Sequence, residues 1–354
     1  MFALLEASAR VYLFGLAGLV PSRINSVHGL HQTGFVRASP EPRLGWELEP
    51  NIDSYFKLVR FRTNSRGLRD REYTLAKPEE SFRVAVVGAS FALPAGVAIE
   101  DAFHSLLEER LTGEPAGLRY EFINFAVGMY GPEQVLAALE LRALDYDPDL
   151  ILFTTTLLSE PAMLVAPGSQ GGRKTEAPLS LLVFQRTYPV LQSFLLRLLR
   201  YRLGAVSDAS APVGIFEQAF IDLVARVRPD TRPLDLARDR AVLPAPPALP
   251  VLDRLARLQG QRGVPIVVVR LEFDTHREVS GDRPSRSDLP TRCRELSLLC
   301  HDTRDAFEGT DAHGFWVHPL DPHPNARAHE RFARSIAEFL RGHGLLEPRR
   351  AEAQ

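Results

Sequence analysis

Three residues of this sequence have the side-chain types that cleave an ester by nucleophilic attack. Ser90 follows Gly88 and Ala89 at the end of a short apolar run, and Asp321 and His323 stand together far downstream. A serine hydroxyl is a weak nucleophile until a histidine accepts its proton, and the histidine needs a carboxylate that fixes its tautomer. Residues of these three types can form such a triad when a fold brings them together.

The segment that contains Asp321 and His323 is rich in proline. Pro322 and Pro324 stand on either side of His323, and Asn325 follows. Proline fixes its own backbone and disfavours a helical conformation in the residue before it, so this segment is expected to be extended. Both polar side chains can then be held rigidly at the edge of a pocket.

The same residues also have plainer interpretations. A serine that follows a strand and a glycine often only caps a helix. Asp311, His313 and His318, together with the downstream Asp-Pro-His, could instead be metal ligands, because both residue types favour such sites. Their spacing matches no compact ligand motif, so we expect neither a metal site nor a cofactor.

Apolar runs and helical stripes alternate from about residue 83 onward. The runs are short and β-branched, as buried parallel strands are, and the segments between them carry apolar residues at helical spacing. The expected strands cover 84–88, 120–126, 149–155 and 264–271, and the expected helices cover 103–111, 132–144, 249–260 and a final stretch from Asn325 to Gly342 or Gly344. This alternation predicts a doubly wound α/β domain whose parallel sheet opens its ligand crevice at the carboxyl ends of the strands.

Four segments, in this order, resemble the bacterial SGNH/GDSL-type hydrolases that carry an N-terminal extension. They read FRVAVVGASFALPAGV, YEFINFAVGMYGPEQ, YDPDLILFTT and DPHPNARAHERFA, and the upstream LGWELEPN and NSRGLRDREY resemble the extension. The likeness runs from about residue 43 to about residue 341. It implies a flavodoxin-like sheet, the Ser90, Asp321 and His323 triad, and an oxyanion hole made by the backbone N–H groups of Ser90 and Gly128.

The sequence departs from the family pattern at two places. Ala89 stands where the family has an acidic residue, and Ser159 with Glu160 aligns with the family's Asn-Asp pair, whose Asn donates to the oxyanion. Ser159, or a threonine among 154–156, could take the place of that donor. Three functions stay open: an acyl or acetyl esterase, an acyltransferase that uses the same triad, and a catalytically weak binding module.

The regular alternation leaves two regions outside it. Residues 1–80 form a turn-rich N-terminal extension, and about 161–248 form a helical insertion with a Gly-rich entry and a Pro-rich exit. The insertion is either a lid or substrate platform or a packing addition. The main domain is therefore expected to cover 81–345, followed by a disordered tail at 346–354.

Composition narrows the partners of the chain. The 354 residues carry a net charge of −2, with the basic residues spread along the chain, so no nucleic-acid partner is expected. The apolar run 11–20 is too short to span a bilayer, and no basic start with a cleavage site marks a secretory signal. A helix that lies on a membrane and one that packs on its own protein both fit residues 1–20. The expected substrate is a small-molecule, glycan or lipid ester, and the compartment stays open.

Five other residues carry weaker signals. Cys293 and Cys300 are seven residues apart, about 10 Å on one helix, which predicts two separate thiols. The adjacent Arg69 and Asp70 are expected to stabilise a turn. His329 is expected to pack or hydrogen-bond within the final helix.

Overall fold

The computed structural model describes residues 1–24, 30, 34–112, 118–156, 163, 194–195, 198, 249–273, 289–318 and 321–347. Its centre is a five-stranded sheet in the order β6-β5-β7-β8-β9, and every neighbouring pair is parallel. The strands are β5 (Ser81–Val87), β6 (Arg119–Asn124), β7 (Leu150–Thr155), β8 (Ile266–Arg270) and β9 (Leu299–Asp302). Counted along the chain this order is 2-1-3-4-5, the flavodoxin-like arrangement, so the predicted fold class is confirmed.

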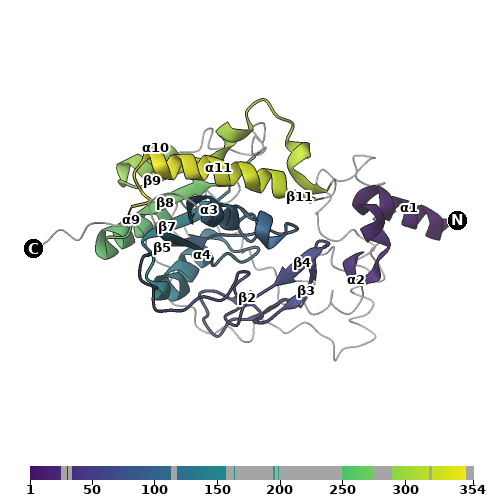
Figure 1. Cartoon of the computed structure of the whole chain (residues 1–354), viewed down its shortest axis with the longest axis horizontal. Coiled ribbons are helices and arrows are strands. Elements are labelled where there is room, and N and C mark those ends of the chain that lie inside the picture. The colour runs from purple at the N-terminus through teal and green to yellow at the C-terminus, as the bar shows by residue number, and fades with distance from the viewer. Residues whose placement is uncertain are drawn as a thin grey trace, which may run out of the picture.

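Helices cover the sheet on both faces. Helix α3 packs against α11 in one layer, and α4 packs against α9 in the other (Figure 1). The helices are α1 (Phe2–Phe14), α2 (Pro21–Ile24), α3 (Phe103–Thr112), α4 (Pro132–Ala138), α9 (Val251–Arg262), α10 (Leu289–Glu295) and α11 (Ala326–Gly342). Shorter helical turns cover Gly15–Leu19, Ile99–Asp101, Leu144–Tyr146, Thr303–Phe307 and Ala312–Phe315, with a π-helical turn at Leu139–Ala143.

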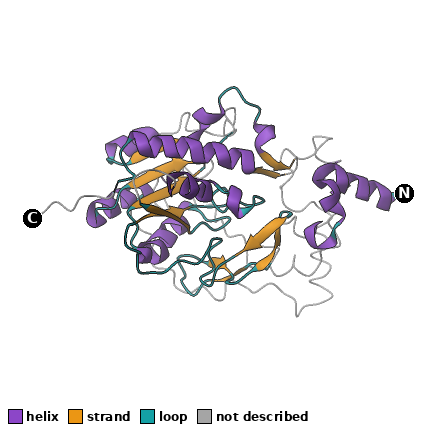
Figure 2. Ribbon diagram, viewed as in Figure 1, coloured by secondary structure: helices purple, strands orange, loops and turns teal. Residues whose placement is uncertain are grey.

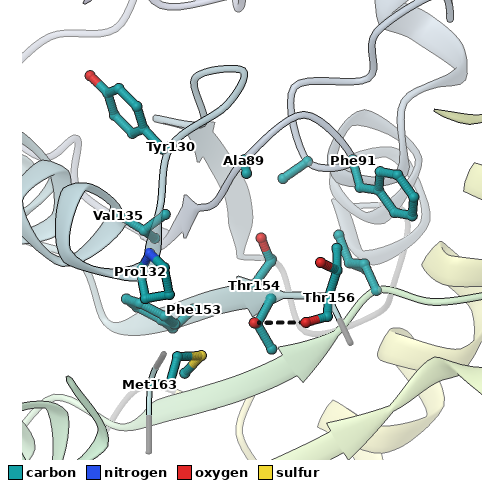
Figure 3. Close-up of a pocket in the computed structure, with 12 residues that line it drawn as sticks. Ala89, Phe91, Tyr130, Pro132, Val135, Phe153, Thr154, Thr156 and Met163 are labelled. Carbon is teal, nitrogen blue, oxygen red and sulfur yellow. Dashed lines mark hydrogen bonds between the residues drawn. The ribbon is translucent and has the colours of Figure 1, made fainter. Parts of the chain in front are cut away.

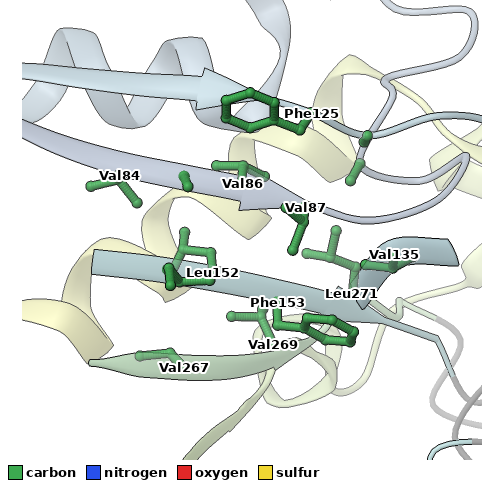
Figure 4. Packing of buried hydrophobic residues seen from close by; sticks show 14 of the residues in the cluster. Val84, Val86, Val87, Phe125, Val135, Leu152, Phe153, Val267, Val269 and Leu271 are labelled. Carbon is green, nitrogen blue, oxygen red and sulfur yellow. The ribbon is translucent and has the colours of Figure 1, made fainter. Parts of the chain in front are cut away.

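The central strands are buried because helices lie over both faces. Val84, Val86, Leu152 and Val267 are all inaccessible to solvent, and Figure 4 shows their side chains packed between neighbouring strands. Burying one such side chain stabilises a fold by about 1.5–3 kcal/mol. This explains why the strands read as continuous apolar runs rather than as alternating ones.

The predicted helices are confirmed with two corrections at their ends. The segment that begins at Pro132 leaves regular α-helical geometry after Ala138 and continues in π and 3-10 turns. Helix α9 passes through Gly260, which was expected to end it, and ends at Arg262, with Gly263 as its C-cap. Gly263 has a φ of 65°, the left-handed conformation that glycine adopts most readily after a helix.

The prediction of two separate thiols is wrong. Cys293 lies on α10 and Cys300 on β9, and a disulfide joins them with their Cα atoms 6.2 Å apart. The six intervening residues do not form one helix, because the chain turns at Ser297, whose φ is 55°. The turn shortens the distance that a continuous helix would have kept at about 10 Å.

The N-terminal extension contains more regular structure than its sequence suggested. Besides α1 and α2 it forms two antiparallel pairs outside the central sheet, β1 (Val36–Ala38) with β2 (Trp46–Leu48) and β3 (Asp53–Phe56) with β4 (Val59–Arg62) (Figure 2). A third antiparallel pair, β10 (Trp316–His318) with β11 (Asp321–Pro324), precedes α11. Apart from positions 163, 194–195 and 198, the expected insertion at 161–248 lies outside the described residues, and so does the tail from 348.

Among the residues that the structure describes, no helix is both long enough and apolar enough to span a membrane. Helix α1 lies at one end of the molecule (Figure 1), and its Phe14 ring packs edge-on against His318 of β10. A small apolar cluster of Leu13, Phe14, Ile24 and Phe194 packs there, separate from the main core.

Candidate active site

The predicted nucleophile lies where the order of the sheet reverses. Strand β5 lies between β6 and β7 in the sheet. The strand that follows β5 in the chain, β6, is added on one side of it, and the next strand, β7, is added on the other side. In open α/β sheets, ligands bind at the carboxyl ends of the strands at this switch point. Ser90 comes three residues after the end of β5, so the topology places it at the expected crevice.

A narrow pocket opens at this point (Figure 3). Its lining includes Ala89, Phe91, Tyr130, Met163 and the three threonines 154–156 at the end of β7. Its volume of about 20 Å³ has room for about one water molecule. Ser90 is half-buried and stands between two of the lining residues, Ala89 and Phe91.

Gly88 allows the loop after β5 to lie directly against β7. A β-carbon at this position would lie only 1.9 Å from Thr154 Oγ1. The Thr154 hydroxyl donates to the carbonyl of Val87 at 2.9 Å, and that of Thr155 donates to the carbonyl of Thr156 at 3.4 Å. Because a hydroxyl has one proton to donate, neither Thr154 nor Thr155 supplies the missing oxyanion donor in this arrangement. Ser159 and Glu160 lie outside the described residues.

Strand β11 presents Asp321 and His323 together. Asp321 Oδ1 lies 2.5 Å from His323 Nδ1 and accepts the backbone N–H of the same histidine at 3.1 Å. Burial acts to raise the pKa of Asp321, but the contacts with His323 and Lys57 outweigh it and hold that pKa well below its ordinary value. The carboxylate is therefore ionised at neutral pH and can accept the Nδ1 proton, as the prediction requires.

Phe91 links the Ser90 loop to β11. Its ring packs edge-on against the His323 imidazole, with centroids 5.6 Å apart, and stacks on Phe273 at 5.9 Å. The structure thus brings the residue next to Ser90 into contact with the predicted base. Within the described part of the chain, the Ser90 hydroxyl makes no hydrogen bond, either to the backbone or to His323.

The two predicted oxyanion donors are also uncommitted. Among the described residues, neither the backbone N–H of Ser90 nor that of Gly128 has a hydrogen-bond acceptor. Gly128 is buried, its carbonyl accepts from Trp46 Nε1 at 3.3 Å, and a β-carbon on it would lie 2.8 Å from Leu30 Cδ2. Buried N–H groups are nearly always paired, so the Gly128 N–H is unusual in having no acceptor among the described residues.

Lys57 is a member of the site that sequence analysis missed. It lies in the tight turn between β3 and β4, and its Nζ lies 2.5 Å from Asp321 Oδ2 and 3.1 Å from His323 Nδ1. Burial lowers the pKa of Lys57, while the Asp321 carboxylate acts to raise it. Nothing near Lys57 in the sequence suggests chemistry, because its partners are more than 260 residues away.

Arg69 and Asp70 stabilise more than their own turn. The Arg69 guanidinium is buried and donates to the carbonyls of Leu93, Pro94 and Val97, in the segment that follows Ser90. Burial lowers its pKa to about 9. Asp70 Oδ2 accepts the backbone N–H of Asn124 at the end of β6, and burial raises the Asp70 pKa to about 7.

The residues of the metal-ligand alternative do not converge. His313 pairs with Asp311 on an exposed turn and packs against Trp316, whereas His318 Nε2 lies 4.0 Å from Asp321 Oδ2. Across the described residues, no three His, Cys, Asp or Glu side chains are grouped so that they could hold a metal ion. The His329 prediction is confirmed, since its buried Nδ1 accepts the N–H of Phe103 and burial lowers its pKa to about 3.

Comparison with solved structures finds likenesses of low identity. The structure of TesA aligns with 75% of this chain and 99% of its own, at 13% identity and a TM-score of 0.36. The acetyl xylan esterase AlAXEase aligns over 73% and 100%, at 13% identity and a TM-score of 0.38. A mutant of Axe2, an acetyl-xylooligosaccharide esterase from Geobacillus Stearmophilus, aligns over 79% and 100%, at 13% identity and a TM-score of 0.38. No family model matches the chain, and no curated protein matches it.

Two of these three structural neighbours are named as esterases. The likeness concerns the fold, which the strand order already establishes.

Proposed function

We propose that the chain is a serine-dependent ester hydrolase that works through an acyl-Ser90 intermediate. Ser90 Oγ attacks the ester carbonyl while His323 Nε2 takes its proton, and the N–H groups of Ser90 and Gly128 bind the oxyanion. His323 then protonates the departing alcohol and afterwards activates the water that hydrolyses the acyl-enzyme. The observation that carries this proposal is the contact of Phe91, next to Ser90, with the ring of the Asp321-paired His323.

Turnover of a short-chain aryl ester tests the nucleophile. Ser90→Ala should lose almost all hydrolysis, whereas Ser105→Ala, a matched change of a half-buried serine on α3, should keep it. A fluorophosphonate probe should label the wild-type protein at Ser90 and leave the Ser90→Ala variant unlabelled. Equal turnover in Ser90→Ala and wild type would remove Ser90 from the mechanism.

The narrow pocket favours an acetyl ester. Its volume of about 20 Å³ fits a methyl group but not a long acyl chain. We therefore infer that the acyl group is small, and that kcat/KM on an aryl acetate exceeds that on the matching octanoate. The reverse order would assign a long acyl chain instead. Analysis of products formed with an added polyol distinguishes hydrolysis from transfer of the acetyl group to a sugar hydroxyl.

A non-catalytic binding module is the second candidate function. Ala89 in place of an acid, and a Ser90 hydroxyl that is not bonded to His323, favour it. This candidate requires glycan or lipid binding without covalent labelling of Ser90. Robust labelling by the fluorophosphonate probe would exclude it.

We also propose that residues 1–80 complete the 81–345 domain and that α1 meets a membrane surface. Arg69 and Lys57 support the first part, because both extend from the extension to the site. Exposed apolar side chains support the second, since Leu4 and Tyr12 of α1, and Leu16 in the turn that follows it, are 74%, 61% and 77% accessible. Sedimentation with phosphatidylglycerol vesicles should decrease in Leu4→Glu/Leu16→Glu, and unchanged sedimentation would contradict membrane contact.

A further inference from the structure

Lys57 is a buried lysine whose position needs a functional explanation. Its side chain is 9% accessible, and its ammonium lies against the carboxylate of Asp321 and the imidazole of His323. Burying an ammonium is unfavourable unless the charge is paired, and Asp321 supplies that pairing here. Asp321 thus has donors at both carboxylate oxygens, the Nδ1 and backbone N–H of His323 at Oδ1 and Lys57 Nζ at Oδ2.

The contacts of Lys57 decide which nitrogen of His323 carries the proton. An ammonium can only donate, and a neutral imidazole carries one proton, on Nδ1 or on Nε2. The Nδ1 atom is closer to Asp321 Oδ1, at 2.5 Å, than to Lys57 Nζ, at 3.1 Å. The Nδ1 proton therefore belongs to the bond with Asp321, and the lone pair that can accept a proton is on Nε2. By occupying Oδ2, Lys57 holds the carboxylate in the orientation that this tautomer needs.

Lys57 also places a positive charge beside the imidazole ring. A nearby ammonium disfavours protonation of an imidazole, whereas a nearby carboxylate favours it. Among the described residues, the other titratable groups around the pair include His318, which is 4.0 Å from Asp321 Oδ2, and His329 on α11; both histidines carry a charge only when protonated. His323 thus lies between the Asp321 carboxylate, which favours protonation of the imidazole, and the Lys57 ammonium, which disfavours it.

The turn that carries Lys57 is built at a conformational cost. Lys57 and Leu58 have φ values of 47° and 72°, both in the left-handed region, in a two-residue hairpin where Asn-Gly is the favoured pair. Non-glycine residues in that region are strained, and such strain is often found at functional sites. Leu58 packs against the Phe14 and Phe194 cluster, so both turn residues are used for contacts.

From this geometry we propose that Lys57 is a positioning residue for the base: it orients Asp321 and keeps His323 neutral down to a lower pH. This inference rests on the proposed function, because it assigns His323 the role of base. Lys57 is not itself required to touch the substrate.

NMR titration of the His323 imidazole tests the proposal without any turnover. The His323 signal is identified as the one that His323→Gln removes. In Lys57→Met the titration midpoint of His323 should rise by about 1–3 pH units, because the Lys57 charge no longer offsets the effect of the Asp321 carboxylate on the imidazole. Lys57→Arg, which keeps the charge, should stay near the wild-type midpoint.

Lys77→Met is the matched control, since Lys77 pairs with Asp149 at 2.8 Å and has no contact with this site. It should leave the midpoint unchanged.

An unchanged midpoint in a folded Lys57→Met variant would overturn the proposal. If the methionine variant fails to fold, Lys57→Gln gives the same test, because it keeps a donor for Asp321 Oδ2 but carries no charge. With an active enzyme, the acidic limb of the kcat/KM profile against pH should move upward in parallel. Failure of the esterase proposal would appear instead as Ser90-independent turnover, which leaves the NMR result readable.

Discussion

The hydroxyl of Thr154 lies against Gly88, in the space that a β-carbon on residue 88 would need. The distance from that β-carbon to Thr154 Oγ1 would be 1.9 Å, and to the Ala92 β-carbon 2.8 Å. The Thr154 hydroxyl is held there by its bond to the Val87 carbonyl. The loop that carries Ser90 is therefore packed directly against the end of β7.

Gly88→Ala should destabilise the protein by about 1–3 kcal/mol, the usual cost of overpacking a core. Equilibrium unfolding in urea measures this loss. Thr154→Ala in the same chain should recover part of it, because the closest obstacle is removed while Ala92 stays. A double variant that is as unstable as the sum of the two single variants would show that the two residues are not coupled.

Replacing Arg69 by Met should weaken the segment after Ser90. Three buried carbonyls, those of Leu93, Pro94 and Val97, would lose the guanidinium donor, and only Pro94 keeps another, the Val97 N–H. The Leu93 and Val97 carbonyls left unsatisfied cost about 1–3 kcal/mol each. We expect a lower free energy of unfolding and slower fluorophosphonate labelling of Ser90. Arg66→Met, which changes an exposed arginine of the same segment, is the control. Equal effects of the two substitutions would contradict a specific role for Arg69.

Stability should fall as the pH decreases from about 6.5 toward 3. Burial lowers the pKa of His329 to about 3, so in this range the unfolded chain binds a proton that the folded chain excludes. The stabilisation that comes from keeping His329 neutral is complete above its unfolded pKa of about 6.5. It is lost as the pH falls toward its folded pKa of about 3, by up to about 1.4 kcal/mol per pH unit.

His329→Asn removes the titrating group and keeps an acceptor for the Phe103 N–H. Its stability should therefore depend less steeply on pH between about 3 and 6.5. Urea unfolding at several pH values compares the two slopes. Parallel curves for wild type and variant would show that His329 does not contribute to the acid sensitivity.

The double variant Cys293→Ser/Cys300→Ser should lose about 2–3 kcal/mol of stability, the amount expected for cross-linking a short loop. Thermal unfolding with and without dithiothreitol gives an internal control. Reductant should lower the Tm of the wild type toward that of the double variant and leave the variant unchanged. A reductant effect of equal size on both proteins would not come from this disulfide.

Local sequence patterns were sufficient for most of the sheet. The strands β5, β6, β7 and β8 are apolar runs of 5–7 residues with helical stripes between them, and these patterns depend only on neighbours in the chain. Strand β9 was missed because Leu299–Asp302 is short and half its residues are polar. The disulfide was misjudged because a continuous helix was assumed where the chain turns.

The sequence by itself also determined the pairing of Asp321 with His323. Two residues apart on an extended segment lie on the same side, and the prolines enforce that conformation. Ser90 was placed at the sheet edge by its position directly after an apolar run. Each of these inferences concerns atoms that the covalent chain already keeps close.

Only the tertiary structure decided which distant groups join them. Lys57 is 266 positions from His323 in the sequence and reaches it because a strained hairpin of the extension packs against β11. Thr154 blocks the space beside Gly88, and Arg69 holds the segment after Ser90, through packing between strands and loops that no local pattern encodes. Such contacts depend on how whole strands, hairpins and loops pack against one another. The spacing of residues along the chain does not predict that packing.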